Sequence, residues 1–348
     1  MIGKRGARIK GSDPFGERSL RLTRRPMQLL GGRFRFESNS GRLLRLVDSA
    51  YAGLPPHRLS ASAPELKVSL VLTRHPDAHR FAEPRKQRRG SEPPPVRMLE
   101  GAGLLGGATA GSSFVIMSPR ERAALVGISP QMLEFPYHAR YELIEFAVFT
   151  LAFRTQSLLP MHAACVGHRG RGVLLMGPSG AGKSTVALHC LLDGLEFLTE
   201  DGAFLAPRTM LATGVPNFIH IRADSLRWLG RSLEAAKIRN SPVIRRRSGV
   251  EKFEVNLRRA PFRLAQSPLK IVAIVFLSAR GAADRALLRP LRHREVLGKV
   301  ARAQGYAVNQ PQWRDFSANL SHLDAFELRR GRHPREAVEA LRELLASE

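Results

Sequence analysis

A glycine-rich loop between an apolar segment and a helix-forming segment restricts the fold of this chain most strongly. Residues 177–184 read GPSGAGKS, which fits the pattern G-x-x-x-x-G-K-[ST] at every fixed position, and Thr185 follows. The preceding residues 172–176 are typical of a buried parallel strand, and residues 184–192 predict a helix. A strand, loop and helix in this order predict an α/β fold, with helices packed on a sheet.

The same loop predicts a binding site for nucleotide phosphates. Glycines let backbone N–H groups approach phosphate oxygens that a side chain would block. Lys183 can reach the β- and γ-phosphates, the Ser184 hydroxyl can ligate Mg²⁺, and the helix N-terminus contributes the positive end of its dipole. The predicted nucleotide-binding residues are Gly177, Pro178, Ser179, Gly180, Ala181, Gly182, Lys183, Ser184 and Thr185.

Two adjacent carboxylates follow the next predicted strand. Residues 196–199 predict this strand, and Glu200 and Asp201 stand at its end. Ligands of doubly wound sheets gather at the carboxyl ends of strands, so we expect both acids near the γ-phosphate and its metal. They can act as two oxygen ligands, or as one ligand and one base. Asp201-Gly202 is also a turn signal, so a polar strand end without a function stays open as the alternative.

The most obvious later strand supplies no competing acid. The later apolar strand expected at residues 271–277 runs into Ser278-Ala279-Arg280, which argues against an ordinary ATPase or GTPase layout. His162 stands at the start of a predicted hairpin that leads into the glycine-rich loop. A lone His near a strand start is usually structural or solvated, so the residues alone assign it no role.

The ordered set of His162, the loop 177–184, Glu200 and Asp201 resembles the catalytic domain of the HPr kinase/phosphorylase family and its relatives. In that family a His precedes the loop Lys, and two adjacent Asp follow it, at the same distances as here. The resemblance covers about residues 140–345. It implies a P-loop kinase core of the HPr kinase type, a mixed sheet flanked by helices, that uses ATP and Mg²⁺.

The resemblance also implies roles for the polar side chains. His162, Glu200 and Asp201 would form the catalytic group, in which Glu200 takes the proton from the attacking serine hydroxyl. Ser184 and Asp201 would hold the metal. This chain departs from the family because the first acid is Glu, whose extra methylene keeps the base strength but changes the reach. On this basis Glu200→Asp is expected to retain or raise activity.

The sequence therefore predicts an ATP- and Mg²⁺-dependent kinase that phosphorylates a serine hydroxyl on a small protein, a peptide or the free amino acid. The later motif linked to phosphorylase action is not found, which favours a kinase-only relative. The chain also resembles HPr-kinase-related serine kinases found beside peptide-modification genes, including those that act on ribosomally made peptides. Two other functions stay open, a nucleotide-binding regulatory module with little turnover and a nucleic-acid-associated NTPase. The resemblance also suggests a homo-oligomer.

Charge and apolar content restrict the partners and the compartment. The formal net charge of +25 raises nucleic acid as a partner, but the basic runs are not interleaved with aromatic residues, which argues against it. An acidic peptide or phosphoprotein suits the basic run 245–247 better. The longest apolar stretch, 143–153, contains Glu145 and is too short for a membrane span. Without a secretory signal, and with Cys165 and Cys190 both in apolar surroundings, a cytoplasmic location is expected.

Three parts are expected along the chain. Residues 1–26 are basic with little apolar periodicity, which predicts a disordered tail whose deletion leaves stability unchanged. Met27 could be the true start. Residues 27–135 predict a small α+β lobe, and residues 136–348 the P-loop kinase domain, tied to the lobe by a helix over 137–155.

Three further polar residues are candidates for the cleft. Lys252 follows a basic loop and could be an active-site cation on a mobile arm, although a solvent-facing strand Lys remains the alternative. His220 and Arg222 lie on a predicted strand beyond the acid pair and could line the cleft as well.

Overall fold

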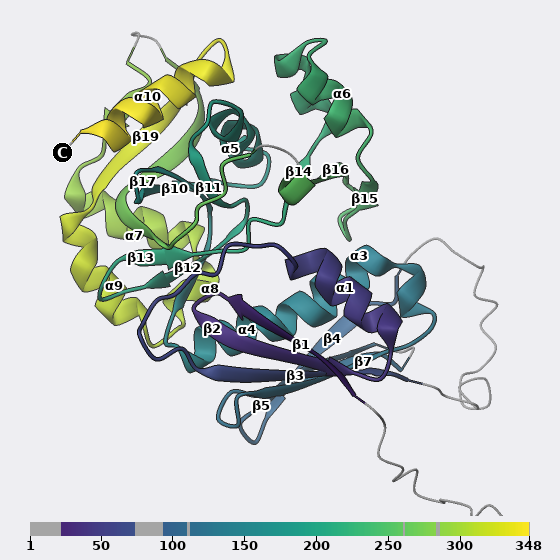
Figure 1. Ribbon diagram of the computed structural model, residues 1–348. Helices are drawn as coiled ribbons and strands as arrows, with labels where there is room; N and C mark the ends of the chain where they lie inside the picture. The colour runs from purple at the N-terminus through teal and green to yellow at the C-terminus, as the bar shows by residue number, and fades with distance from the viewer. Residues whose placement is uncertain (1–21, 74–92, 110–111, 260–261, 283–285, 348) are drawn as a thin grey trace, which may run out of the picture.

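The computed structural model describes residues 22–73, 93–109, 112–259, 262–282 and 286–347, which form two lobes with a sheet in each (Figure 1). The sheet of the N-terminal lobe has seven strands in the order β1-β2-β3-β7-β6-β5-β4. These are β1 (Thr23–Leu29), β2 (Gly32–Ser38), β3 (Glu65–Leu72), β4 (Val96–Gly101), β5 (Leu104–Thr109), β6 (Phe114–Ser118) and β7 (Ala123–Ile128).

Helices cover one face of the N-terminal sheet. Helix α1 (Gly41–Tyr51) packs there beside a long helical segment made of α3 (Pro136–His138), a π-helical turn η2 (Ala139–Glu145) and α4 (Phe146–Thr155). The apolar side chains of this long segment belong to the same hydrophobic core as those of β2, β3, β6 and β7. The segment is therefore structurally part of the N-terminal lobe, whereas the sequence placed it in the kinase domain.

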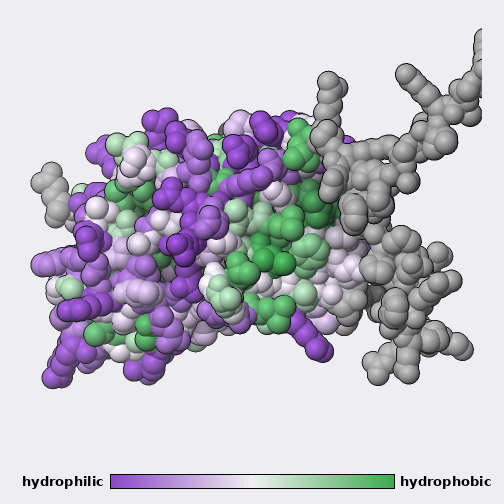
Figure 2. All heavy atoms as spheres, turned by 90° about the horizontal axis from the view of Figure 1, so that it is seen from below, coloured by the Kyte–Doolittle hydropathy of each residue, from purple (hydrophilic) through white to green (hydrophobic). Residues whose placement is uncertain are grey.

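The opposite face of the same sheet carries exposed apolar side chains. Figure 2 shows the molecule from below, with a hydrophobic area next to polar surroundings. Alternation along the strands places inward residues in the core and outward residues in solvent. The exposed large apolar residues of these strands include Val71, Leu99, Leu104, Ile116 and Leu125. Among the described residues, helices thus cover this sheet on one face only.

Two expectations for the N-terminal lobe need correction. Residues 1–21 of the expected tail lie outside the described residues, but β1 begins at Thr23 and pairs with β2 along its whole length. Deleting residues 1–26 would remove more than half of β1, so we now expect it to destabilise the lobe. The glycines at 101–107 would suggest a turn, but this segment contains most of β5; a Cβ at Gly106 would lie 2.8 Å from the backbone oxygen of Val115, so the glycine permits the close approach of β6.

The second lobe contains a mixed sheet of nine strands. Its main order is β11-β9-β10-β17-β13-β12-β8, with β19 beside β17 and β18 beside β19. These are β8 (Leu159–His162), β9 (Ala164–His168), β10 (Arg171–Met176), β11 (Glu196–Thr199), β12 (Gly202–Ala206), β13 (Leu211–Thr213), β17 (Leu269–Gly281), β18 (Leu288–Pro290) and β19 (Asp324–Arg330). Strands β10, β17 and β19 run parallel, and the predicted mixed α/β class is confirmed.

Helices cover both faces of this sheet. Along β10, Val173 and Leu175 join the core beneath α5 (Lys183–Leu192) and α10 (Pro334–Ala346), whereas Leu174 and Met176 join a core on the other face. That other face is covered by α7 (His293–Ala303), α8 (Gly305–Val308) and α9 (Trp313–Asn319). The buried strand is apolar on both sides, as the sequence predicted. In the part of the chain described, no helix is long and apolar enough to cross a membrane.

A small three-stranded sheet, in the order β14-β16-β15, lies beside α5 of the second lobe and above α1 and α3 of the N-terminal lobe in the view of Figure 1. Its strands are β14 (Phe218–Ile221), β15 (Val243–Arg245) and β16 (Glu251–Asn256), and two short helices accompany it, η3 (Ala223–Leu229) and α6 (Leu233–Arg239). Arg247, in the loop between β15 and β16, forms an ion pair with Glu142 of η2 and donates to the carbonyls of Pro93 and Pro94. The basic run 245–247 thus contacts the N-terminal lobe.

A buried charge cluster joins η2 to this small sheet. Arg140 donates to both carboxylate oxygens of Glu254 on β16, and its Nε lies 3.2 Å from Oε1 of Glu145. Its guanidinium also lies 4.3 Å from the ring centroid of Phe218 on β14. One buried cation therefore neutralises carboxylates from two parts of the fold.

We expect Arg140→Met to lower the free energy of unfolding by about 3–5 kcal/mol, because it leaves Glu145 and Glu254 buried without their cation. Urea denaturation measures this loss. Arg208→Met is the matched control, because the ion pair of Arg208 with Asp315 is exposed and worth no more than about 1 kcal/mol. Equal losses in the two variants would contradict a structural role for the cluster.

Candidate functional site

The glycine-rich loop and the acid pair lie at the same edge of the nine-stranded sheet. Strands β10 and β11 each pair antiparallel with β9, which lies between them, so they run in the same direction. The loop 177–182 follows the carboxyl end of β10, and Glu200 and Asp201 follow the carboxyl end of β11. One helix, α5, leads from the loop back to the start of β11. The fold therefore brings the two motifs together.

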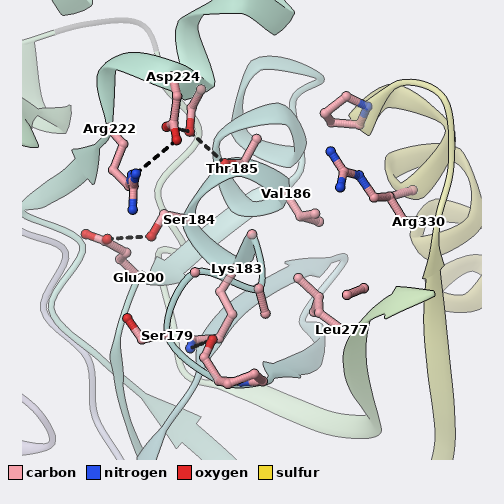
Figure 3. Close-up of a pocket in the computed structure, with 18 of the residues that line it drawn as sticks. Ser179, Lys183, Ser184, Thr185, Val186, Glu200, Arg222, Asp224, Leu277 and Arg330 are labelled. Carbon is pink, nitrogen blue, oxygen red and sulfur yellow. Dashed lines mark hydrogen bonds and ion pairs between the residues drawn. The ribbon is translucent and has the colours of Figure 1, made fainter. Parts of the chain in front are cut away.

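A cavity of about 580 Å³ lies at this edge. Figure 3 shows part of it, with the loop, the first turn of α5 and side chains from η3 and β19 around it. Its lining includes each of the predicted loop residues from Pro178 to Thr185, together with His162, Glu200 and Asp201. The further candidates Lys252, His220 and Arg222 line it as well.

Glycine is required where the loop enters α5. Gly180 and Gly182 have φ angles of +83° and +100°, in the left-handed region that other residues avoid. Lys183 follows and is almost fully buried, with its Nζ donating to the carbonyl of Gly177 at 2.7 Å. Burial lowers the pKa of the Lys183 amine, while Asp201 acts in the opposite direction. The ammonium thus folds back onto its own loop.

Glu200 is buried and bound through both carboxylate oxygens. Ser184 Oγ donates to Oε1 at 2.7 Å, whereas the backbone N and Nδ1 of His220 donate to Oε2 at 2.7 and 2.8 Å. Burial alone would raise the pKa of Glu200, but His220 and the hydrogen bonds outweigh it and lower the pKa to about 2. Glu200 is therefore an anion, and a carboxylate with so low a pKa is a weak base.

His220 continues this chain of contacts toward the N-terminal lobe. Its Nε2 lies 3.3 Å from Oε1 of Glu254, the partner of Arg140. Burial would lower the pKa of His220, but the carboxylates of Glu200 and Glu254 raise it to about 9. Ser184 is thus linked through Glu200, His220 and Glu254 to Arg140 on η2. Glu254 and Arg140 could not be assigned to the site from the sequence, because their contacts come from strands and helices far apart in the chain.

Asp201 has different surroundings. Its Oδ1 lies 3.0 Å from His162 Nδ1, because β8 pairs with β12 and places His162 opposite Gly202. The side chain of Gln304 holds the backbone of His162 from both sides, accepting from its N at 2.7 Å and donating to its O at 3.0 Å. The His162 and Asp201 side chains are 55% and 32% exposed. This pair can therefore be reached from solvent, unlike Glu200.

Two cations from β16 and its preceding loop accompany Lys183 in the cavity. Lys252 Nζ lies 3.8 Å from Glu200 Oε1, with its side chain only 15% exposed, so Lys252 is not the solvent-facing strand residue weighed as the alternative. Arg246 Nη1 lies 3.8 Å from Asp201 Oδ2. Arg246 belongs to the basic run 245–247, and no pattern in the sequence indicates that it reaches Asp201. Clustered cations of this kind favour a polyanionic ligand.

The oxygen donors at the loop suit Mg²⁺. The residues described include no group of three or more His, Cys, Asp or Glu side chains that could hold a metal ion by themselves. Ser184 Oγ and Glu200 Oε1 lie 2.7 Å apart and are hard oxygen donors, so an ion there would take its other ligands from phosphates and water. The resemblance paired Ser184 with Asp201, but in the structure Glu200 contacts Ser184, and Asp201 contacts His162 instead.

No model of a known protein family matches this chain, and no curated protein matches it. Among solved structures, the Hpr(Ser) kinase/phosphatase from Coxiella burnetii is similar to 53% of this chain and 96% of its own, with 14% sequence identity and a TM-score of 0.26. A similarity of this size carries no argument about activity.

Proposed function

We propose that this protein is an ATP- and Mg²⁺-dependent kinase that transfers the γ-phosphoryl group to a hydroxyl of a small protein or peptide, serine being the acceptor that the resemblance implies. The observation that supports this most is the accessible His162–Asp201 pair beside a glycine-rich loop and three cations. Asp201 can accept a proton from a hydroxyl that approaches from outside. The loop and the cations can bind the phosphates of a nucleotide.

The glycine-rich loop and the residues that follow it bind the nucleotide. Loop N–H groups and Lys183 bind the phosphates, for which the Lys183 ammonium has to leave the carbonyl of Gly177. Ser184 and Glu200 would hold Mg²⁺, which neutralises phosphate charge when bound. His220 and Glu254 keep the Glu200 carboxylate facing Ser184.

Transfer requires a base and stabilisation of charge. The acceptor oxygen forms a bond to the γ-phosphorus as the bond to the bridging β–γ oxygen breaks, and ADP leaves with that oxygen. Asp201 takes the hydroxyl proton, while His162 holds the Asp201 carboxylate in place. Lys183, Lys252 and Arg246 stabilise the charge on the transferred group. Glu200 and Asp201 thus exchange the roles that the resemblance implied.

Incubation with γ-labelled ATP tests the proposal, with free serine, serine-containing peptides and small proteins as acceptors. We expect Mg²⁺-dependent transfer of label to a hydroxyl. Tight nucleotide binding without transfer to any acceptor would instead indicate a regulatory module. Hydrolysis that DNA or RNA stimulates, with steep salt dependence, would indicate a nucleic-acid-associated NTPase.

Glu200→Asp is expected to lower transfer by up to about a hundredfold, because a shorter side chain cannot keep both Ser184 and His220 as partners. From the sequence alone, Glu200→Asp would be expected to retain or raise activity, because Asp is the residue of the family that the chain resembles. The contacts of Glu200 reverse this expectation. Initial rates of transfer measure the effect. Glu196→Asp, at the start of the same strand and away from the cavity, is the control. Activity equal to the wild type in Glu200→Asp would show that the two contacts of Glu200 are unimportant.

A further inference from the structure

We propose that the side of the cavity next to α10 holds the nucleobase, and that the guanidinium of Arg330 stacks on its face. This inference rests on the proposed function, because it places the base of the same nucleotide. It adds a binding subsite that neither the loop motif nor the acid pair specifies.

The two sides of the cavity differ in chemistry. Figure 3 shows the acid Glu200 with Ser184, Arg222 and Asp224 on one side, and Val186, Leu277 and Arg330 on the other. The second side is apolar where it meets the core. Its buried residues come from α5, β17, β19 and α10, and are Val186, Leu277, Leu328 and Ala337. A nucleotide has the same division, with charged phosphates at one end and a flat, largely apolar base at the other.

The first turn of α5 accounts for this division. Successive residues of a helix are about 100° apart around its axis, so Val186 projects about 200° away from Ser184. Ser184 contacts Glu200, and Val186 therefore faces the other flank, beside Leu277 of β17. Phosphates bound at the start of α5 would leave the rest of the nucleotide free to extend over Val186.

Arg330 is the side chain available to contact the base. It ends β19, the parallel neighbour of β17, and Figure 3 shows its guanidinium directed into the cavity. No hydrogen bond or ion pair of this side chain occurs within the ranges that the structure describes, and the residue is exposed. A planar guanidinium over an apolar surface is suited to stack on an aromatic ring.

The remaining polar and aromatic groups near this side already contact one another. The rings of Trp228 and His333 meet edge-on with centroids 5.4 Å apart, and His333 Nε2 lies 3.1 Å from the carbonyl of Trp228. The guanidinium of Arg227 lies 4.8 Å from the Trp228 ring centroid. These residues line the cavity as well, and within the described ranges Arg330 is a cation without such contacts beside the apolar surface.

Binding of Mg²⁺-ATP and Mg²⁺-tripolyphosphate to the full chain, measured by calorimetry, separates contacts with the base from contacts with phosphates. We expect Arg330→Ala to weaken ATP binding about tenfold and to leave tripolyphosphate binding unchanged. Arg330→Lys keeps the positive charge but loses the planar guanidinium group, so this variant should also bind ATP more weakly than the wild type. The control is Arg332→Ala, since Arg332 is exposed and does not line the cavity.

Three results would overturn the subsite but not the proposed function. If Arg330→Ala weakened the binding of both ligands equally, Arg330 would contact the phosphates and not the base. If Arg330→Ala bound both ligands as tightly as the wild type, Arg330 would make no contact with the nucleotide. A wild-type protein that binds ATP no more tightly than tripolyphosphate would have no base contact at all. A wild-type protein that binds neither ligand would refute the proposed function as well, so the two failures are distinguishable.

Discussion

Lys183→Ala is expected to lower phosphoryl transfer by about a hundredfold to a thousandfold while the protein stays folded, the loss typical of removing one charge-stabilising donor. Among the described residues, the Lys183 ammonium donates to the carbonyls of Gly177 and Pro178 of its own loop, at 2.7 and 3.4 Å, and to no other group, so its removal breaks no hydrogen bond to another element. Its charge would act on the phosphates of the nucleotide. The loss should therefore be seen in kcat/KM and hardly in the midpoint of thermal unfolding.

Lys270→Ala is the matched control for this variant. Lys270 is exposed on β17 and donates to the carbonyl of Thr209, away from the cavity. We expect wild-type transfer from it. Transfer near the wild-type rate in a well-folded Lys183→Ala protein would show that the glycine-rich loop is not the phosphate site, and the proposed function would then be wrong.

Replacing Glu200 or Asp201 by its amide is expected to impair phosphoryl transfer in two different ways. Asp201→Asn should lower kcat by about a hundredfold or more, the usual contribution of a general base, with the Mg²⁺ requirement unchanged. Glu200→Gln should mainly raise the Mg²⁺ concentration needed for activity, because an amide is a poorer ligand for a hard cation. The structural reason is that Ser184 contacts Glu200, while His162 contacts Asp201.

Titration of transfer rates with Mg²⁺ in both variants separates the two roles. Loss of transfer by Glu200→Gln at saturating Mg²⁺, with only a raised Mg²⁺ requirement in Asp201→Asn, would contradict the roles proposed here. Glu200 would then be the base and Asp201 the metal ligand, as the family resemblance implies. Small and equal effects from both variants would show that the acid pair is only a polar strand end.

Several features of the fold could be predicted because they depend on local patterns. The apolar run 172–176 and the turn before it predicted the hairpin of β9 and β10, and the residues after the glycine-rich loop predicted α5. The strand β5 was missed because its glycines suggest a turn, whereas they serve the close approach of β6. The strand β19 was also missed, and with it the position of Arg330 at the cavity.

The sequence by itself determined the α/β class, the glycine-rich loop and the presence of two acids at the end of the next strand. These depend on short-range spacing, since glycine conformation and strand–helix order are local properties of the chain. Only the tertiary structure decided which acid contacts which partner. The pairing of β8 with β12 brings His162 to Asp201, and β14 brings His220 to Glu200. Side-chain direction at a strand end depends on such long-range contacts, which a local pattern does not contain.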